Sequence, residues 1–380
     1  MKQDLLFSGN FGLERETLRV DAQGRLAQTP HPFGDDAHIT RDFCENQVEL
    51  ITPVCKSIDE VLQSLQTLHD RTVEKLSQQN ESLWIYSNPP HFNSENDIPI
   101  ARFGGEQSFK QSYREALEKR YGKRLMLFSG VHFNFSFPDA LLHEWHDGTE
   151  SFPAFRDVLY LRLYRQLFRH SWLLVLLTAA SPDYDASLDG DNLQGVVRSE
   201  YASPRNSARG YWNQFVPVLN HNSLEAFAAD IQEYVTKGLL FSVSELYLPI
   251  RLKPRGENTL ENLVRNGVDH IELRMFDLNP LCPLGVNRND LLFAHLLILY
   301  LVHQEDAELT PEQQEQAVAA HQQAAAYEPG KAMTEQALQI LRRMKQEFSS
   351  HPEALTVIEY QKQKLTEKRL CEQVRSRNFY

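Results

Sequence analysis

The sequence is short of positive charge. Its 380 residues include 39 Lys and Arg against 51 Asp and Glu, which gives a formal net charge of −12. No basic run occurs along the chain, so we expect no nucleic-acid partner. Cysteine is scarce as well: Cys44, Cys55, Cys282 and Cys371 are scattered without metal-type spacing. That usage is typical of a reduced, cytoplasmic protein.

Long apolar runs are also missing. "WLLVLLTAA" (172–180) and "LLFAHLLILYLV" (291–302) fall short of the ~20 residues that span a bilayer, so both predict buried helices and no membrane association. The opening "MKQDLLFSGNFG" has no apolar core of the kind a signal peptide needs. The chain contains no P-loop, no Rossmann glycine fingerprint and no H-E-x-x-H motif. These common nucleotide and zinc signatures are therefore excluded.

The residue patterns predict a mixed chain. Strands are expected at 10–20, 44–53, 82–87, 124–137, 246–253 and 270–277. Helices are expected at 57–79, 105–121, 152–170, 223–238, 288–303, 310–326, 331–349 and 352–374. Because the strands lack a βαβ rhythm, we predict an α+β fold with a mostly antiparallel sheet and helices on one face. The Gln-, Ala- and Glu-rich segment 305–380 predicts solvated helices after a first domain at 1–304.

Three predicted strands carry unusual polar side chains on one face. Side chains alternate across a strand, so Glu14 and Glu16 share a face in "GLERETLRV". By the same rule His132 lies with Asn134, and Glu272 with Arg274, opposite apolar faces. Two readings stay open. In the first, these faces are solvated strand surface, His132 is a core residue, and Glu272 and Arg274 form an ion pair. In the second, the faces line a cavity that holds divalent cations such as Mg²⁺, which favours oxygen ligands.

A fourth stretch, "RDFCENQVELITPV" (41–54), adds Asp42 and Glu49. These two residues differ in parity, so a straight strand cannot aim both carboxylates at one cavity. Either a bulge intervenes, or Asp42 lies just before the strand.

Six ordered blocks resemble the bacterial glutamate–cysteine ligases, including the ligase half of bifunctional glutathione synthases. The blocks are "GLERETLRV" (12–20), "DFCENQVELITPV" (42–54), "YREALEKRYG" (113–122), "SGVHFNFSFP" (129–138), "ELYLPIR" (245–251) and "HIELRMFDLNPLCPLGV" (270–286). They span about residues 10–300, and we find no counterpart beyond Val302. The resemblance implies a glutamine synthetase-like, curved, mostly antiparallel sheet that forms an active-site funnel, with helices on its outer face. Segment 305–380 is expected to pack on this domain.

The resemblance also implies a reaction. Glutamate would be activated by ATP as γ-glutamyl phosphate and joined to cysteine, giving γ-glutamylcysteine in the first step of glutathione synthesis. The expected partners are these three small molecules and Mg²⁺ or Mn²⁺; the oligomeric state stays open. The family's metal ligands fall on Glu14, Glu16, Asp42, Glu49, His132 and Glu272.

The remaining family positions divide between phosphoryl transfer and the acceptor. Arg274 is expected to contact the transferring phosphoryl group, and Arg114 and Asn134 to contact glutamate or the phosphorylated intermediate. The acceptor is expected among Phe43, Tyr113, Leu117, Tyr211 and Tyr247, with Arg205 near its carboxylate. The alternatives are a related carboxylate–amine ligase with another amine, a metal-dependent hydrolase, and a non-catalytic descendant.

Overall fold

The computed structural model describes residues 7–103 and 109–377. In this part of the chain a seven-stranded sheet has the order β2-β3-β1-β5-β9-β8, and β4 pairs with the end of β1. Its named strand pairs are all antiparallel. The strands are β1 (Asn10–Val20), β2 (Ile39–Thr40), β3 (Gln47–Ile51), β4 (Ser82–Leu83), β5 (Val131–Ser136), β8 (Ile250–Pro254) and β9 (Val268–Phe276). A separate pair is formed by β6 (Asp183–Asp185) and β7 (Val196–Arg198).

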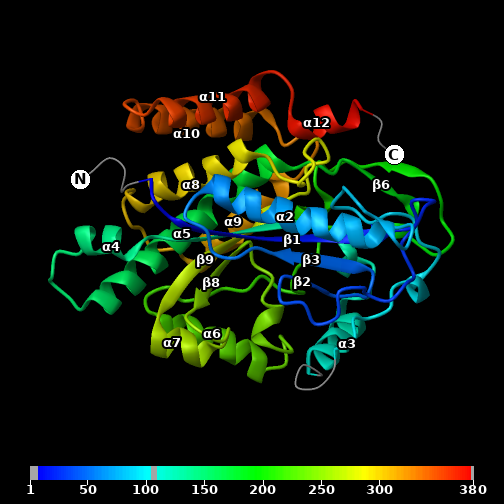
Figure 1. The fold of residues 1–380 in the computed structure, drawn as a ribbon. Helices are drawn as coiled ribbons and strands as arrows, with labels where there is room; N and C mark the ends of the chain where they lie inside the picture. The colour runs from blue at the N-terminus through cyan, green and yellow to red at the C-terminus, as the bar shows by residue number, and fades with distance from the viewer. Residues whose placement is uncertain (1–6, 104–108, 378–380) are drawn as a thin grey trace.

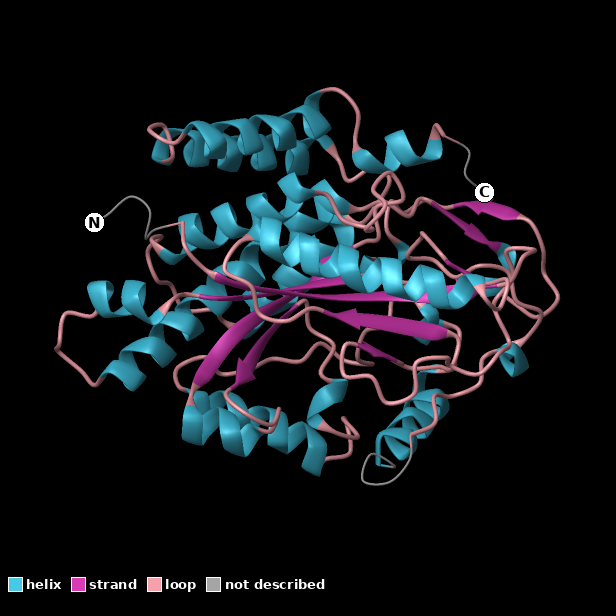
Figure 2. Cartoon of the chain, in the orientation of Figure 1, coloured by secondary structure: helices cyan, strands magenta, loops and turns pink. Residues whose placement is uncertain are grey.

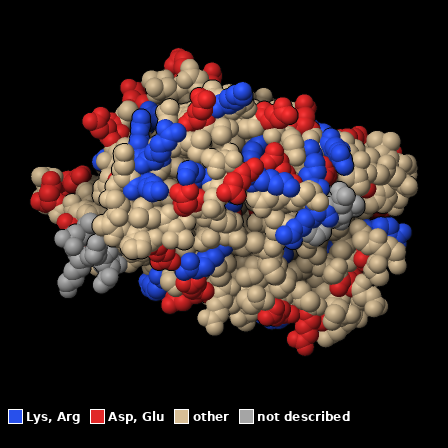
Figure 3. Space-filling model, turned by 90° about the horizontal axis from the view of Figure 1, so that it is seen from above, with Lys and Arg blue, Asp and Glu red and all other residues tan. Residues whose placement is uncertain are grey.

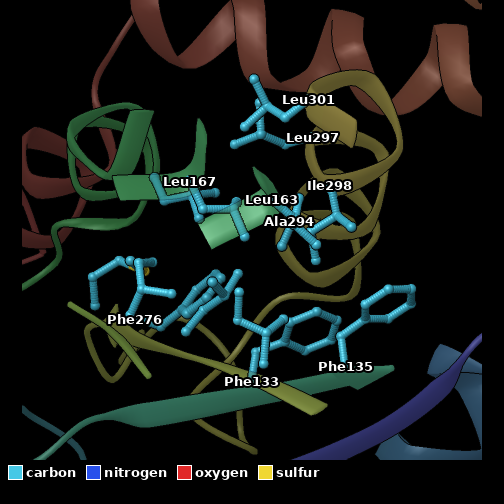
Figure 4. Packing of buried hydrophobic residues seen from close by; sticks show 14 of the residues in the cluster. Phe133, Phe135, Leu163, Leu167, Phe276, Ala294, Leu297, Ile298 and Leu301 are labelled. Carbon is cyan, nitrogen blue, oxygen red and sulfur yellow. The ribbon is translucent and has the colours of Figure 1, made fainter. Parts of the chain in front are cut away.

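Helices cover the apolar face of the sheet (Figures 1 and 2). Phe133 and Phe135 from β5 and Phe276 from β9 point toward α5 (Phe152–Thr178) and α8 (Arg288–Val302), as Figure 4 shows. The apolar run at 172–180 covers the buried C-terminal part of α5, and the run at 291–302 makes up most of α8, so both lie in buried helices as predicted. α2 (Ile58–Ser77) packs beside β1 and β3, and its N-cap residue is Ser57, whose hydroxyl accepts from the amide of Glu60. The predicted α+β class is confirmed.

The other helices surround this core. They are α3 (Phe109–Tyr121), α4 (Asp139–Trp145), α6 (Leu224–Thr236), α7 (Leu260–Asn266), α9 (Pro311–Ala324), α10 (Lys331–Glu347), α11 (Pro352–Thr366) and α12 (Leu370–Arg375). α9 packs on α5 and α11 on α8. Side chains of α9, α10 and α11 share one apolar cluster with the sheet. The division after residue 304 stays a prediction.

Several predicted elements differ from the structure. The strand expected at 124–137 starts at Val131, because Leu125–Leu127 forms a 3-10 turn. The strands expected at 44–53, 82–87 and 246–253 are also shorter, and the helix expected at 352–374 is interrupted between α11 and α12. α4 and α7 were not predicted; with seven residues each, they are too short to display helical periodicity. The start of the helix expected at 105–121 lies outside the described residues.

The surface seen from above mixes charges of both signs (Figure 3). Across residues 7–103 and 109–377, no helix is both long enough and apolar enough to cross a bilayer.

Candidate active site

A cavity of about 200 Å³ opens on the polar face of the sheet. Side chains of β1, β5, β8 and β9 form its floor, and α3 with the segments around residues 42 and 247 forms its walls. The predicted site residues that line it are Glu14, Glu16, Asp42, Phe43, Glu49, Tyr113, Arg114, Leu117, His132, Tyr211, Tyr247, Glu272 and Arg274. Residues from seven separate stretches of the sequence therefore meet in one place.

Strand register brings the first metal-ligand candidates together. Glu14 is paired with His132 across β1 and β5, and β9 places Glu272 on the other side of β5. Nδ1 of His132 lies 3.2 Å from Glu14 Oε2 and 3.2 Å from Glu272 Oε1. Ligand atoms of these three residues all lie within 4.8 Å of one another. Such a set has the size of a single cation site with oxygen and imidazole ligands.

A second acidic group lies beside the first. Glu16 faces Glu49 across β1 and β3. Burial, together with the charges of Asp42, Glu14 and Glu16, raises the pKa of Glu49 well above its ordinary value. Asp42 lies in a bend before β3 begins at Gln47, which is the second of the two arrangements considered above. Like charges packed in a buried site repel unless a cation lies between them.

The histidine responds to these carboxylates. Burial and the Arg274 charge oppose protonation, yet Glu16, Glu14 and Glu272 raise the pKa of His132 above its ordinary value. Burial, together with the charge of Asp42, raises the pKa of Glu16 against the pull of His132. Glu16 Oε2 is buried and has no hydrogen-bond partner in the described part of the chain. An unsatisfied buried carboxylate oxygen of this kind is what a bound cation would satisfy.

Cations from two strands gather around Glu272. Arg274 Nη1 lies 2.6 Å from Glu272 Oε1, and Lys253 Nζ lies 3.0 Å from Oε2. Glu272 is fully buried, but Lys253 and Arg274 outweigh burial and hold its pKa well below the ordinary value. Lys253 and Arg251 line the cavity and were not predicted. The signal was present, because alternation in "PIRLKP" puts both on the face opposite Ile250 and Leu252.

Aromatic side chains line another part of the cavity. Phe43, Leu117 and Tyr247 are buried there, and the Tyr211 and Tyr247 rings meet edge to face at 5.1 Å. Met126, Phe128 and Ser244 also line the cavity. Sequence reasoning missed these three, because they lie in turns whose direction depends on tertiary packing.

Arg114 borders the acidic group from α3. Its Nε donates to the carbonyl of Asp42 and its Nη1 to the carbonyl of Lys110, at 2.9 Å, and Nη2 is 4.0 Å from Asp42 Oδ1. Burial lowers its pKa, partly offset by Asp42 and Glu49.

The structure does not bring two predicted residues to the cavity lining. Asn134 Nδ2 donates to Glu14 Oε1 at 3.0 Å, so its amide orients a carboxylate. Arg205 donates to the carbonyls of Arg274, at 2.5 Å, and Phe276, at 3.4 Å. It lines a smaller neighbouring cavity of about 40 Å³ that shares Tyr211, Tyr247 and Arg274 with the first. Direct substrate contacts of Asn134 and Arg205 stay predictions that this geometry does not support.

Comparison with known proteins identifies the family. The sequence model of the glutamate-cysteine ligase family matches residues 1–239 and 235–324. The glutathione biosynthesis bifunctional protein GshAB of Listeria innocua is 42% identical over 326 residues, which cover 82% of this chain and 42% of that protein. A glutamate–cysteine ligase of Clostridium acetobutylicum is 32% identical, over 85% of this chain and 78% of the relative. The chain belongs to the glutamate–cysteine ligase family.

Solved structures agree with that assignment. A bifunctional glutathione synthetase from Pasteurella multocida superposes with a TM-score of 0.87 at 27% identity, covering 99% of this chain and 50% of that one. A glutamate–cysteine ligase from Francisella tularensis, in complex with AMP, gives 0.87 at 25% identity, covering 97% and 84%. The match thus extends beyond Val302, where none was expected. The chain spans about 42% of the length of the curated GshAB relatives.

Proposed function

We propose that this chain joins glutamate to cysteine at the expense of ATP, through γ-glutamyl phosphate, giving γ-glutamylcysteine. One observation carries the proposal: carboxylates from separate strands and His132 converge on a single cavity beside Arg274. Reaction of a carboxylate with a polyanion demands neutralised charge and fixed geometry. Family membership supports the same activity.

The residues fit divalent cations. Glu14, His132 and Glu272 form one candidate ligand set, and Glu16, Glu49 and Asp42 a second, adjoining one. When bound, such ions would neutralise phosphate oxygens and align them for displacement. Carboxylate oxygens suit Mg²⁺, and the imidazole also suits Mn²⁺.

The positively charged side chains of Arg274 and Lys253 would contact the transferred phosphoryl group. In the first step an oxygen of the glutamate γ-carboxylate attacks the γ-phosphorus of ATP, and ADP leaves. Arg274 can grip two phosphoryl oxygens with its planar guanidinium, while Glu272 holds it in position at 2.6 Å. Lys253, on the neighbouring strand, lies 3.0 Å from the same Glu272 carboxylate and would add a second positive charge beside the phosphoryl group.

The aromatic wall would hold the acceptor. In the second step the cysteine amine attacks the acyl carbon of γ-glutamyl phosphate, and phosphate leaves. Phe43, Leu117 and Tyr247 shield this side of the cavity from water, which would otherwise hydrolyse the acyl phosphate. We place the reaction in the cytoplasm, because all four cysteines are free thiols, as a reducing compartment favours.

An ADP-release assay tests the proposal. Purified protein is given glutamate, ATP and Mg²⁺, and a panel of amines is scanned, including L-cysteine. ADP release that depends on both glutamate and cysteine is expected. A higher kcat/KM with another amine would establish a related carboxylate–amine ligase instead, and turnover that needs no ATP would refute ligation. Glu14→Gln serves as the site-directed negative control.

A further inference from the structure

A buried carboxylate outside the main cavity joins two of its walls. Glu245 is 0% exposed, in the 3-10 turn just before Tyr247. Its Oε1 accepts from Arg120 Nη1 at 2.6 Å and from the Tyr121 hydroxyl at 2.7 Å, and Oε2 accepts from the amide of Phe241. The carboxylate therefore ties the end of α3 to segment 238–247.

Arg120 strengthens this junction. Its Nη1 and Nη2 also donate to the carbonyls of Leu239, at 2.6 Å, and Gly238, at 3.1 Å. The basic segment "EKRYGKR" (118–124) has the composition of a solvated helix end, yet the charge of Arg120 is paired with the fully buried Glu245. An ion pair with one buried member resists solvent screening, unlike a surface pair.

The junction continues to the aromatic wall through Asn213. The Asn213 Nδ2 donates to the carbonyl of Glu245 at 2.7 Å, and its Oδ1 accepts from the amide of Tyr247 at 2.9 Å. The Tyr247 ring meets Tyr121 edge to face at 5.6 Å and Tyr211 at 5.1 Å. Two of these three neighbours of Tyr247 are hydrogen-bonded to Glu245: Tyr121 to its carboxylate and Asn213 to its main-chain carbonyl.

The two joined elements both reach the cavity. α3 contributes Tyr113 and Leu117, and the segment after Glu245 contributes Tyr247. The distance between α3 and Tyr247 sets the width of the acceptor subsite that these aromatic side chains line. The Glu245 side chain does not line the cavity itself, so any influence on substrate must pass through these neighbours.

We propose that Glu245 is a positioning residue that fixes the width of the acceptor subsite and so sets which amine fits. The proposal rests on the proposed function, since it deepens the role of the aromatic wall. Loosening the junction would leave the acidic sites and Arg274 in place. The effect should therefore fall on the acceptor and spare ATP and glutamate.

The test compares Glu245→Gln and Tyr121→Phe with wild type. The first variant keeps the side-chain size and loses the charge; the second removes only one hydroxyl donor and preserves the Arg120 ion pair. Steady-state ADP release is measured with L-cysteine, L-2-aminobutyrate and the longer L-norleucine. Glu233→Gln is the matched control, because its partner Lys237 forms an exposed ion pair on α6.

We expect the KM for L-cysteine to rise about tenfold in Glu245→Gln, which loses a charge-assisted hydrogen bond. In Tyr121→Phe, which loses a single hydroxyl donor, the KM should rise about threefold. The preference for L-cysteine over L-norleucine should fall by a similar factor, with the KM of ATP and glutamate and the kcat changed less than twofold. If a folded Tyr121→Phe variant showed the same acceptor KM and selectivity as wild type, this inference would be overturned and the proposed function would stand. Parallel losses for all substrates would also overturn it, as a merely structural role. Wild type inactive with every amine would overturn the proposed function, and this inference with it.

Discussion

His295 gives the fold a measurable sensitivity to acid. It lies on α8 under the sheet, 4% exposed, with its ring 5.0 Å from Phe11 and 5.1 Å from Phe135. Burial lowers the pKa of His295 from 6.5 to about 3. Because the folded pKa lies below the unfolded one, the unfolded state binds the proton first. The contribution of the neutral His295 to the free energy of unfolding is fully present above pH 6.5 and is lost progressively as the pH falls toward 3.

The magnitude follows from the unfolded pKa. At pH 5, which is about 1.5 pH units below it, one such histidine costs about 2 kcal/mol of the free energy of unfolding, at ~1.4 kcal/mol per unit. His221 and His321 are buried similarly, with pKa values lowered to about 4 and about 3. Wild type should therefore lose stability steeply between pH 7 and 5. His295→Leu should remove about 2 kcal/mol of that loss.

Urea unfolding at pH 7.5 and pH 5 measures the difference, provided that circular dichroism and tryptophan fluorescence give coincident curves. His143→Leu is the control, because His143 is an exposed residue of α4, and leucine can keep the apolar contact with Phe152 on which the ring stacks at 3.9 Å. Its pH dependence should match wild type. Equal losses between pH 7.5 and 5 in His295→Leu and wild type would refute the assignment of a neutral, buried His295.

Three further predictions follow from the site and the core. Glu14→Gln should lower kcat by ~100-fold or more through loss of cation binding, with an unchanged circular dichroism spectrum; near-normal turnover would contradict the ligand assignment. Treatment with EDTA should abolish ADP release, and added Mg²⁺ or Mn²⁺ should restore it; isothermal titration should show cation binding to wild type that Glu14→Gln lacks. Lys364→Met should lower the free energy of unfolding by about 3–5 kcal/mol, since it strips the buried Asp290 of a partner at 2.5 Å; a loss under 1 kcal/mol would show that the pair is not buried in solution.

Alternation along strands predicted which side chains form the sheet floor of the site. Glu14, His132 and Glu272 each lie on the face opposite large apolar side chains, and the structure brings these three together as expected. The family resemblance supplied what alternation could not, including Asp42 outside the strand and Tyr113 on α3. The same period-two pattern places Arg251 and Lys253 on the polar face of β8.

Tertiary contacts decide the rest. The buried role of Arg120 depends on Glu245, 125 positions away, and nothing in the local pattern of "EKRYGKR" indicates it. The family resemblance placed Arg205 near the acceptor carboxylate, yet the direction of its side chain is set by the carbonyls of β9 that accept from it. Short helices such as α4 lie below the length at which periodicity is informative. Sequence thus predicted faces of strands well, and the targets of long side chains poorly.

The strand order also affects how the protein is made. β1 is central in the sheet, but the floor of the cavity is completed only by β9, which lies about 260 residues later. At roughly 5–20 residues per second, a ribosome needs about 13 to 50 s to cover that stretch. Meanwhile Phe133 and Phe135 await α5 and α8, and Glu16 faces Glu49 before Arg274 has emerged. A stalled nascent chain would therefore expose an apolar aromatic surface that is prone to aggregation. Chaperones would have to bind this surface before the active site is complete.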